Sequence, residues 1–392
     1  MTLTAAKDCG SAPASPTGKP SLSRYRFELA TPDDDADLRH VLAATPMAGR
    51  IAVSFRREPS WFAGAVVDGR FRQVIACRDL QTGRMIGFGC RSIRDVYING
   101  RPDTIGYLSS LRLLPEHRNL GLVARGYRFF RELHADSRAP FYLTTIAAGN
   151  RTALGVLTSG RAGLPLYHPA GAYHTVVISL PRRQRPLAEV SGVKVRSAQA
   201  RDLPPVLDFL HNAGPGRQFF PRLQADDFLS PDGAMRGLAL HDLLLAERGD
   251  RLVGTLAGWD QHADRQSVVH AYSSGLHWLR PAYNAWAHVR GIAGLPAPGQ
   301  AMRYLTAALP LVADDDADVF HALVETVRQR SGGGAPTHLL LGLHETDPLL
   351  RVARRFQATC YTTHLFLACW PEGESARAAL DDRVPYLEAG SL

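Results

Sequence analysis

The chain has few cysteines, few lysines and no long apolar run. Its five cysteines include no C-x-x-C pair, which favours neither a disulfide framework nor a zinc site; they are Cys9, Cys77, Cys90, Cys360 and Cys369. No run of about 18 apolar residues occurs, and residues 1–24 lack the apolar centre of a secretory signal. We therefore expect a cytoplasmic protein with no membrane partner and no metal site.

The positive charge is not gathered into one stretch of the sequence. The formal net charge is +8, but acidic clusters at 33–35 and 314–316 lie among the scattered arginines. Nucleic-acid binding needs basic residues grouped on one surface to neutralise phosphates. The distribution argues against a nucleic-acid partner, and the excess charge is better suited to attracting an anionic ligand.

The length and the order of the predicted elements indicate two similar domains. A length of 392 residues suggests two domains at roughly 100 to 200 residues per domain. A strand followed by a capped helix is predicted after residue 24 and again after residue 192, and the later elements repeat in order. We interpret this pattern as a tandem duplication of one α+β unit. The predicted divisions are a tail (1–24), a first domain (25–182), a linker (183–192), a second domain (193–371) and a C-terminal tail (372–392).

One strand-to-helix junction carries the strongest chemical signal. A predicted strand ends at Leu114 and is followed by PEHRNLGLVA and then by an amphipathic helix. Free N–H groups at a helix start, with a Gly that lets oxygens approach closely, form a cradle suited to a pyrophosphate. The predicted cradle consists of Arg118, Asn119, Leu120, Gly121, Leu122, Val123 and Ala124.

The cradle resembles motif A of the Gcn5-related N-acetyltransferases (GNATs), whose loop Q/R-x-x-G-x-G/A holds the pyrophosphate of acetyl-coenzyme A. Arg118, Gly121 and Val123 fall on the three marked positions, with Val where the family has Gly or Ala. Asn150 and Ala153 resemble the Asn-x-x-Ala that begins the family's fourth helix beside the pantetheine arm. The resemblance implies an α+β protein with tandem GNAT folds, each a mixed, mostly antiparallel twisted sheet flanked by helices.

The resemblance also implies a reaction. In the family an amine attacks the thioester of acetyl-coenzyme A directly, and N–H groups of the fourth strand, here near Leu111 and Leu113, contact the pantetheine. We expect an N-acetyltransferase with a small-molecule or peptide amine as acceptor, and a homodimer is possible. Two alternatives stay open: a non-catalytic acyl-coenzyme A sensor, and an N-acyltransferase that uses a longer acyl donor.

The acid that the family often uses is absent. It is a Tyr seven residues after the helix Asn, and this chain has Leu157 there. The candidate catalytic residues are Tyr167, in a predicted loop after the helix, and Tyr107 and Ser109, which share one face of a strand. A structural role in packing is the alternative interpretation for each of these three residues. Some tandem relatives use a C-terminal carboxylate as base, which here is that of Leu392.

The second half has no such cradle. At the equivalent junction the sequence reads ADDDAD over residues 313–318, without Arg-x-x-Gly. Acids at a helix N-terminus satisfy its dipole and repel a pyrophosphate. We expect a degenerate copy that shapes the acceptor site. An insert at 261–296 is rich in His and Trp, and we expect amphipathic helices there with aromatic faces at a domain interface.

Overall fold

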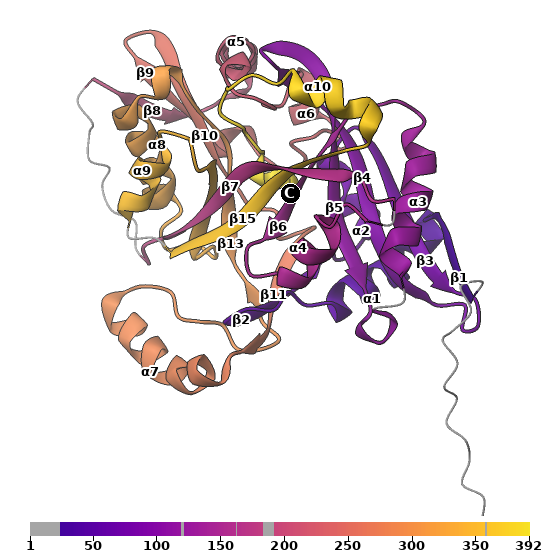
Figure 1. The fold of residues 1–392 in the computed structure, drawn as a ribbon. Coiled ribbons are helices and arrows are strands. Elements are labelled where there is room, and N and C mark those ends of the chain that lie inside the picture. The colour runs from indigo at the N-terminus through magenta and orange to yellow at the C-terminus, as the bar shows by residue number, and fades with distance from the viewer. Residues whose placement is uncertain (1–23, 119–120, 162, 183–191, 357–358) are drawn as a thin grey trace, which may run out of the picture.

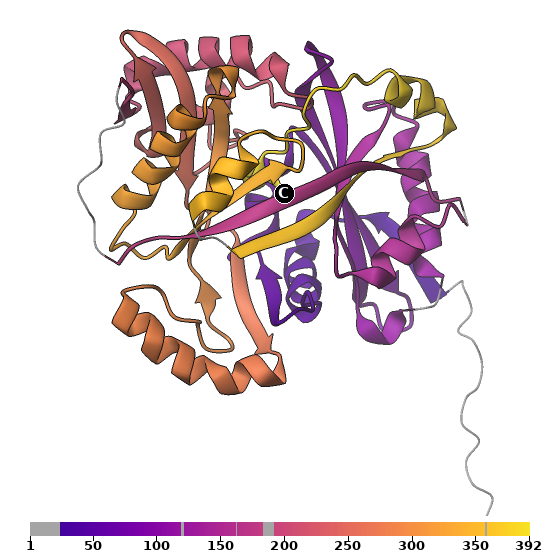
Figure 2. The same cartoon turned by 60° about the vertical axis from the view of Figure 1, so that its left-hand side comes forward.

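The computed structural model describes residues 24–118, 121–161, 163–182, 192–356 and 359–392. In this part of the chain, twelve strands form one continuous sheet (Figures 1 and 2). Its spatial order is β1 (Tyr25–Leu29), β3 (Phe71–Asp79), β4 (Met85–Ile98), β5 (Arg101–Leu113), β6 (Tyr142–Ala147), β15 (Thr359–Cys369), β7 (Leu166–Ser179), β14 (His338–His344), β13 (Tyr304–Val312), β10 (Arg251–Trp259), β9 (Leu243–Arg248) and β8 (Lys194–Ser197).

The described residues also form a small second sheet and ten α-helices. The small sheet has the order β12 (Ala301–Met302), β11 (Gln266–Tyr272) and β2 (Ile51–Arg56). The helices are α1 (Asp35–Ala44), α2 (Trp61–Gly64), α3 (Leu122–His134), α4 (Arg151–Leu157), α5 (Leu203–Ala213), α6 (Ala225–Leu229), α7 (Ser274–Arg290), α8 (Ala317–Arg330), α9 (Leu350–Ala353) and α10 (Glu374–Ala378). No helix among the described residues has the length and apolar character needed to cross a membrane.

The two halves of the chain exchange their last long strands. β15, from the second half, pairs antiparallel with β6 of the first half, while β7 of the first half pairs with β14 of the second. β15 and β7 also pair with each other, which joins the two halves into one sheet. The predicted domains divide the sequence, but the sheet is shared between them because strands of each half pair with strands of the other. The domain boundaries stay a prediction.

Helices cover both faces of the first half of the sheet. Val74 and Ala76 of β3 pack with the buried side of α1, whereas the intervening Ile75 packs with α3 and α4. Successive side chains of a strand point to opposite faces, so α1 lies on one face and α3 and α4 lie on the other. We call these the α1 face and the α3 face.

β5 and β6 separate from each other after a short contact. The two strands are parallel and pair only at Gly106 with Tyr142 and at Tyr107 with Leu143. Beyond this point β5 runs to Leu113 and β6 to Ala147 without pairing with each other. We call this opening the first fork.

A β-bulge lies in β5 beside the first fork. Cys90 pairs with Ser109 and Phe88 pairs with Arg112, so Ser110 and Leu111 together oppose one residue of β4. Ser110 has a φ of 54°, in the left-handed region that non-glycine residues seldom occupy. Bulges of this kind redirect backbone and side-chain groups next to binding sites.

The second half repeats this construction. β13 and β14 are parallel and pair over three residues, from Tyr304 with His338 to Thr306 with Leu340. A bulge follows in β13, where Leu309 has a φ of 52°. We call this opening the second fork. The repeated fork and bulge agree with a duplicated fold.

Two local expectations were wrong. The stretch around Tyr167, predicted as a loop, is part of β7 because residues 166–173 pair with β15. The insert forms α7 as a helix, but its aromatic face is not at a domain interface, since Trp278 is 81% exposed and Trp286 is 49% exposed. In Figures 1 and 2, α7 stands away from the large sheet, beside β11.

Candidate functional site

The start of α3 is open to a ligand. Gly121 is its N-cap with a φ of 69°, and no side chain in the described chain caps the helix. A Cβ placed on Gly121 would have no atom within 4 Å, so space is available where the predicted pyrophosphate would lie. Leu122 is buried under the helix while Val123 and Ala124 are partly exposed. Asn119 and Leu120 lie outside the described residues.

The equivalent helix of the second half is closed by its own carboxylate. The Asp316 side chain accepts hydrogen bonds from the N–H groups of Asp318 (2.9 Å) and Val319 (3.2 Å) at the start of α8. This carboxylate satisfies the positive helix end that an anion would otherwise occupy. The acidic run therefore acts as the sequence predicted, as an internal cap on α8.

The other predicted cofactor residues lie near the first fork with different degrees of exposure. Leu111, in the bulge, is 44% exposed, and Leu113 is half-buried. Arg118 is exposed and donates from Nε to the Leu113 carbonyl at 3.3 Å. Asn150 caps α4, since its side-chain oxygen accepts from the Ala153 N–H at 3.1 Å. The described contacts of Asn150 are those of a helix cap.

Tyr107 lies where the first fork opens. Its hydroxyl is 3.2 Å from the Thr145 Oγ1 on β6, and the Arg94 guanidinium carbon lies 4.4 Å from its ring centroid. Burial raises the pKa of Tyr107 above its usual value, so the hydroxyl is protonated at neutral pH. Ser109 is half-buried and faces the same side as Cys90. Both predicted residues are therefore on the α1 face.

Tyr167 lies on the opposite face. Its hydroxyl hydrogen-bonds to that of Tyr127 on α3, and its ring packs in the cluster that contains Leu108, Val123 and Leu157. Burial raises the pKa of Tyr167 well above its usual value. Tyr167 is thus a protonated hydroxyl in the same cluster as Leu157, the residue at the position of the family's missing Tyr.

A group of charged residues that sequence reasoning missed lies beside Tyr107. The Asp68 carboxylate accepts from Arg57 Nη2 (3.0 Å) and from Arg265, and its backbone oxygen accepts from Arg94 Nε (2.8 Å). Burial raises the pKa of Asp68, but the three guanidinium groups together lower it by more. The net shift of the pKa is therefore downward. Arg265 also donates to the backbone oxygen of Leu392 (3.1 Å). Asp68 and Arg265 are 197 residues apart, so no local pattern could reveal the pair.

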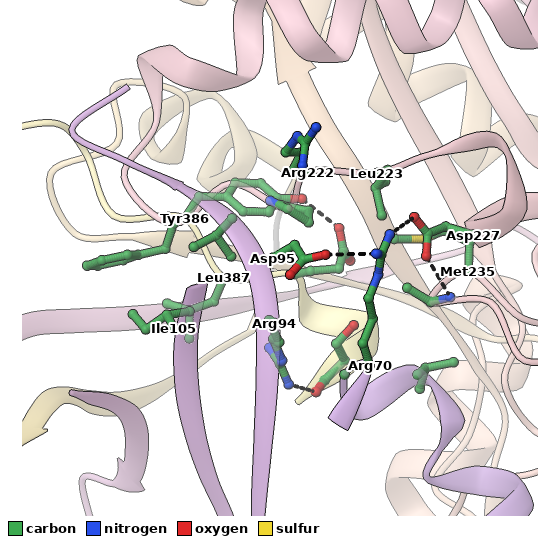
Figure 3. A pocket seen from close by; sticks show the side chains of 18 of the residues that line it. Arg70, Arg94, Asp95, Ile105, Arg222, Leu223, Asp227, Met235, Tyr386 and Leu387 are labelled. Atoms are coloured by element: carbon green, nitrogen blue, oxygen red, sulfur yellow. Dashed lines mark hydrogen bonds and ion pairs between the residues drawn. The ribbon is translucent and has the colours of Figure 1, made fainter. Parts of the chain in front are cut away.

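A small cavity lies beside Arg94, between residues of the first half and residues of the second half (Figure 3). Its volume is about 50 Å³, enough for a few water molecules. Arg94 and Ile105 line it from the first half, and Tyr386 and Leu387 line it from the C-terminal segment. The cavity is too small for coenzyme A, so we assign no cofactor to it.

Comparison with solved structures identifies the fold. A GCN5-related N-acetyltransferase from Sphaerobacter thermophilus matches 94% of this chain and 99% of its own, with 12% identity and a TM-score of 0.53. Saccharomyces cerevisiae N-myristoyltransferase with bound myristoyl-CoA matches 90% of this chain and 81% of its own, with 9% identity and a TM-score of 0.59. A glucosamine N-acetyltransferase region of a fungal multi-domain enzyme matches 92% of this chain but 39% of its own, with 15% identity and a TM-score of 0.56.

Comparison of the sequence with known families and proteins found no match, unlike comparison of the structure. No protein-family model matches the sequence, and no curated protein matches it. At identities of 9% to 15% the solved structures are evidence for the fold alone. The chain has the fold of the GCN5-related N-acetyltransferases in a tandem arrangement, with the second copy lacking the features of the first cradle.

Proposed function

We propose that the protein is an acyl-coenzyme A dependent N-acyltransferase, with acetyl-coenzyme A as its donor and an amine as its acceptor. The single observation that carries this proposal is the combination of the first fork and bulge with the uncapped start of α3 directly after β5. A strand edge offers N–H groups to a thioester carbonyl, and an open helix start offers N–H groups to phosphates.

The reaction follows from the two faces of the first fork. The acyl donor lies on the α3 face, with its pyrophosphate at Gly121 and its thioester near Ser110 and Leu111. The amine approaches from the α1 face, and its nitrogen attacks the carbonyl carbon. The C–S bond breaks, the amide bond forms, and the amine loses a proton. N–H groups at the bulge stabilise the oxyanion that develops on the carbonyl oxygen.

The predicted catalytic residues have separate roles in this proposal. Tyr167 is on the donor face with a protonated hydroxyl, so we assign it the donation of a proton to the leaving thiolate. Tyr107 and Ser109 are on the acceptor face and orient the amine or a water molecule. The Cys90 thiol is not a nucleophile, because burial raises its pKa to about 12.

The second half serves as a wall in this proposal. Asp316 closes the start of α8, and the N–H of Leu309 in the second bulge is held by the Glu388 carboxylate at 3.0 Å. We therefore expect one donor molecule per chain. A longer acyl donor is the second candidate, because the N-myristoyltransferase with the same tandem fold was solved with myristoyl-CoA.

Calorimetric titration of the purified chain with acetyl-coenzyme A tests the proposal. We expect one equivalent to bind and a Gly121→Glu variant to lose binding, because the new carboxylate and side chain occupy the cradle. Gly83→Glu is a matched control, since Gly83 has the same φ of 69° and equally open surroundings in the β3–β4 turn. Tighter binding of myristoyl-coenzyme A would favour the longer donor, and binding without turnover of any amine would favour a sensor.

A further inference from the structure

Two buried guanidinium nitrogens point to an unfilled anion site at the first fork. Among the buried side-chain polar atoms of the described residues, Arg57 Nη1 and Arg112 Nε have no hydrogen-bond partner. Buried polar groups are nearly always hydrogen-bonded, and a charged group left unpaired is especially costly. Arg57 is 8% exposed, so bulk solvent does not supply the missing partner.

Both arginines surround the same point on the α1 face. The charges of both Arg57 and Arg112 lower the pKa of the Cys90 thiol, although burial raises it by more. Arg112 pairs with Phe88 across the β4–β5 ladder, which places it on the face that Cys90 and α1 occupy. The two guanidinium groups therefore flank the bulge on the side from which the amine approaches.

The Asp68 carboxylate does not balance the positive charge of the arginines around it. Asp68 is shared by Arg57 and Arg265, so two guanidinium groups compete for it. The Arg112 Nε has no hydrogen-bond partner among the described residues. Its guanidinium carbon lies 5.8 Å from the ring centroid of Phe55, a contact that positions the group but leaves its N–H donors free.

The charge of Arg112 is destabilised as the chain stands. Burial lowers the pKa of Arg112, and burial also lowers the pKa of Arg265 to about 10. An added anion would reverse this effect, because a planar guanidinium binds a carboxylate through two parallel hydrogen bonds. Arg112 directly follows the bulge residues Ser110 and Leu111 along β5, so an anion bound by its guanidinium group would lie beside the place proposed for the thioester.

We propose that the acceptor is an amine that also carries a carboxylate, and that Arg112, with Arg57 beside it, binds this carboxylate while the amine faces the thioester. The inference rests on the proposed function and names its acceptor class. Arg112 is then a specificity-determining residue, which touches the acceptor but takes no proton. A neutral or dibasic amine would leave Arg57 Nη1 and Arg112 Nε without an acceptor.

Matched pairs of amines test this inference. Each pair consists of an amino acid and the same amino acid with its carboxylate converted to an amide, assayed with acetyl-coenzyme A and the full-length chain. We expect kcat/KM for the carboxylate form to exceed that of the amide form at least tenfold. Arg112→Gln should reduce this ratio to near one, mainly through KM, and Arg112→Lys should restore part of it because charge remains without the planar fork.

Controls separate the failure of this inference from failure of the proposed function. Arg101→Gln changes an exposed arginine at the other end of β5 and should keep the ratio. Acetyl-coenzyme A affinity and circular dichroism report whether each variant is folded. Equal turnover of both amine forms, with no effect of Arg112→Gln on the ratio, would overturn the carboxylate site and leave the acyltransferase intact. Donor binding without acylation of any amine would instead overturn the proposed function. Preference for a phosphate-bearing amine over its carboxylate counterpart would overturn the choice of carboxylate.

Discussion

Replacing Glu388 by Ala should destabilise the protein far more than a surface substitution. Glu388 is 5% exposed, and its carboxylate accepts from three donors: the Leu309 N–H (3.0 Å), the Tyr386 hydroxyl (2.6 Å) and the Gly390 N–H (3.2 Å). Figure 3 shows Tyr386 hydrogen-bonded in this way at the wall of the cavity. Glu388→Ala removes all three acceptors at once and leaves the bulge of β13 without its partner.

The expected loss follows from what each donor needs. A buried donor without a partner costs roughly 1 to 3 kcal/mol, so three donors give an upper limit of about 9 kcal/mol. Two effects reduce this value. Removing a buried carboxylate recovers its desolvation cost, and the neighbouring cavity can admit water to at least one donor. We expect a net loss of about 3 kcal/mol in the free energy of unfolding.

Urea unfolding followed by circular dichroism measures the loss. Glu372→Ala is the control, because Glu372 is also in the C-terminal segment but its side chain is 49% exposed and paired with Arg131. An exposed pair of this kind contributes at most about 1 kcal/mol. If the two variants lose stability to within 1 kcal/mol of each other, the reasoning that Glu388 holds the second bulge is refuted.

Three further predictions concern the same elements. Burial raises the pKa of Glu388 above its usual 4.5, so its stabilising effect is complete below pH 4.5 and declines as pH rises through the folded pKa. The stability difference between wild type and Glu388→Ala in urea titrations should therefore shrink as pH rises above 4.5. Asp316→Ala should cost about 1 kcal/mol by removing the α8 cap, and calorimetry should still find one equivalent of acetyl-coenzyme A because Glu388 continues to occupy the second fork. Tyr167→Phe should lower kcat about tenfold or more while the acetyl-coenzyme A affinity stays within twofold, and an unchanged kcat in single-turnover assays would remove Tyr167 as the acid.

Local features of the fold were predictable from the sequence. The predicted cap of the first helix is an example: Thr31 followed by Pro32 is a pattern typical of a helix start, and a capping box forms there before α1. The stretch QTGRM at 81–85 is typical of a turn between two strands, and β3 and β4 form a hairpin there. These signals act over a few residues, and capping and turn geometry are decided over the same range. The motif before α3 was detectable for the same reason.

The strand exchange could not be predicted in this way. β7 and β15 each have apolar residues that suit a buried strand, but alternation does not specify which neighbour a strand will take. Either strand could have completed its own half. Their mutual pairing from Leu166 with Cys369 onward is a contact between distant parts of the chain, so only the three-dimensional structure reveals that β15 lies next to β6.

The two bulges could not be predicted from the sequence either, because the residues in the left-handed region are not glycines. Ser110 and Leu309 have φ values of 54° and 52°, whereas sequence reasoning looks for Gly at such positions. Non-glycine residues in this region are strained and are held by their surroundings. At Leu309 the surroundings include Glu388, which is 79 residues away along the chain. The determinant is therefore non-local even though the feature itself spans two residues.

The comparison of the two forks gives the strongest physical reason to place a ligand at only one of them. In the second half, the bulge N–H of Leu309 and the start of α8 each bind a carboxylate of the chain, from Glu388 and Asp316. In the first half, no side chain of the described residues caps α3, and we propose that the N–H groups of the bulge face the thioester. The same backbone geometry thus needs an acceptor oxygen at two places, and the second half supplies both internally. In the proposed function, a thioester carbonyl and a pyrophosphate, held in one molecule, would supply them in the first half.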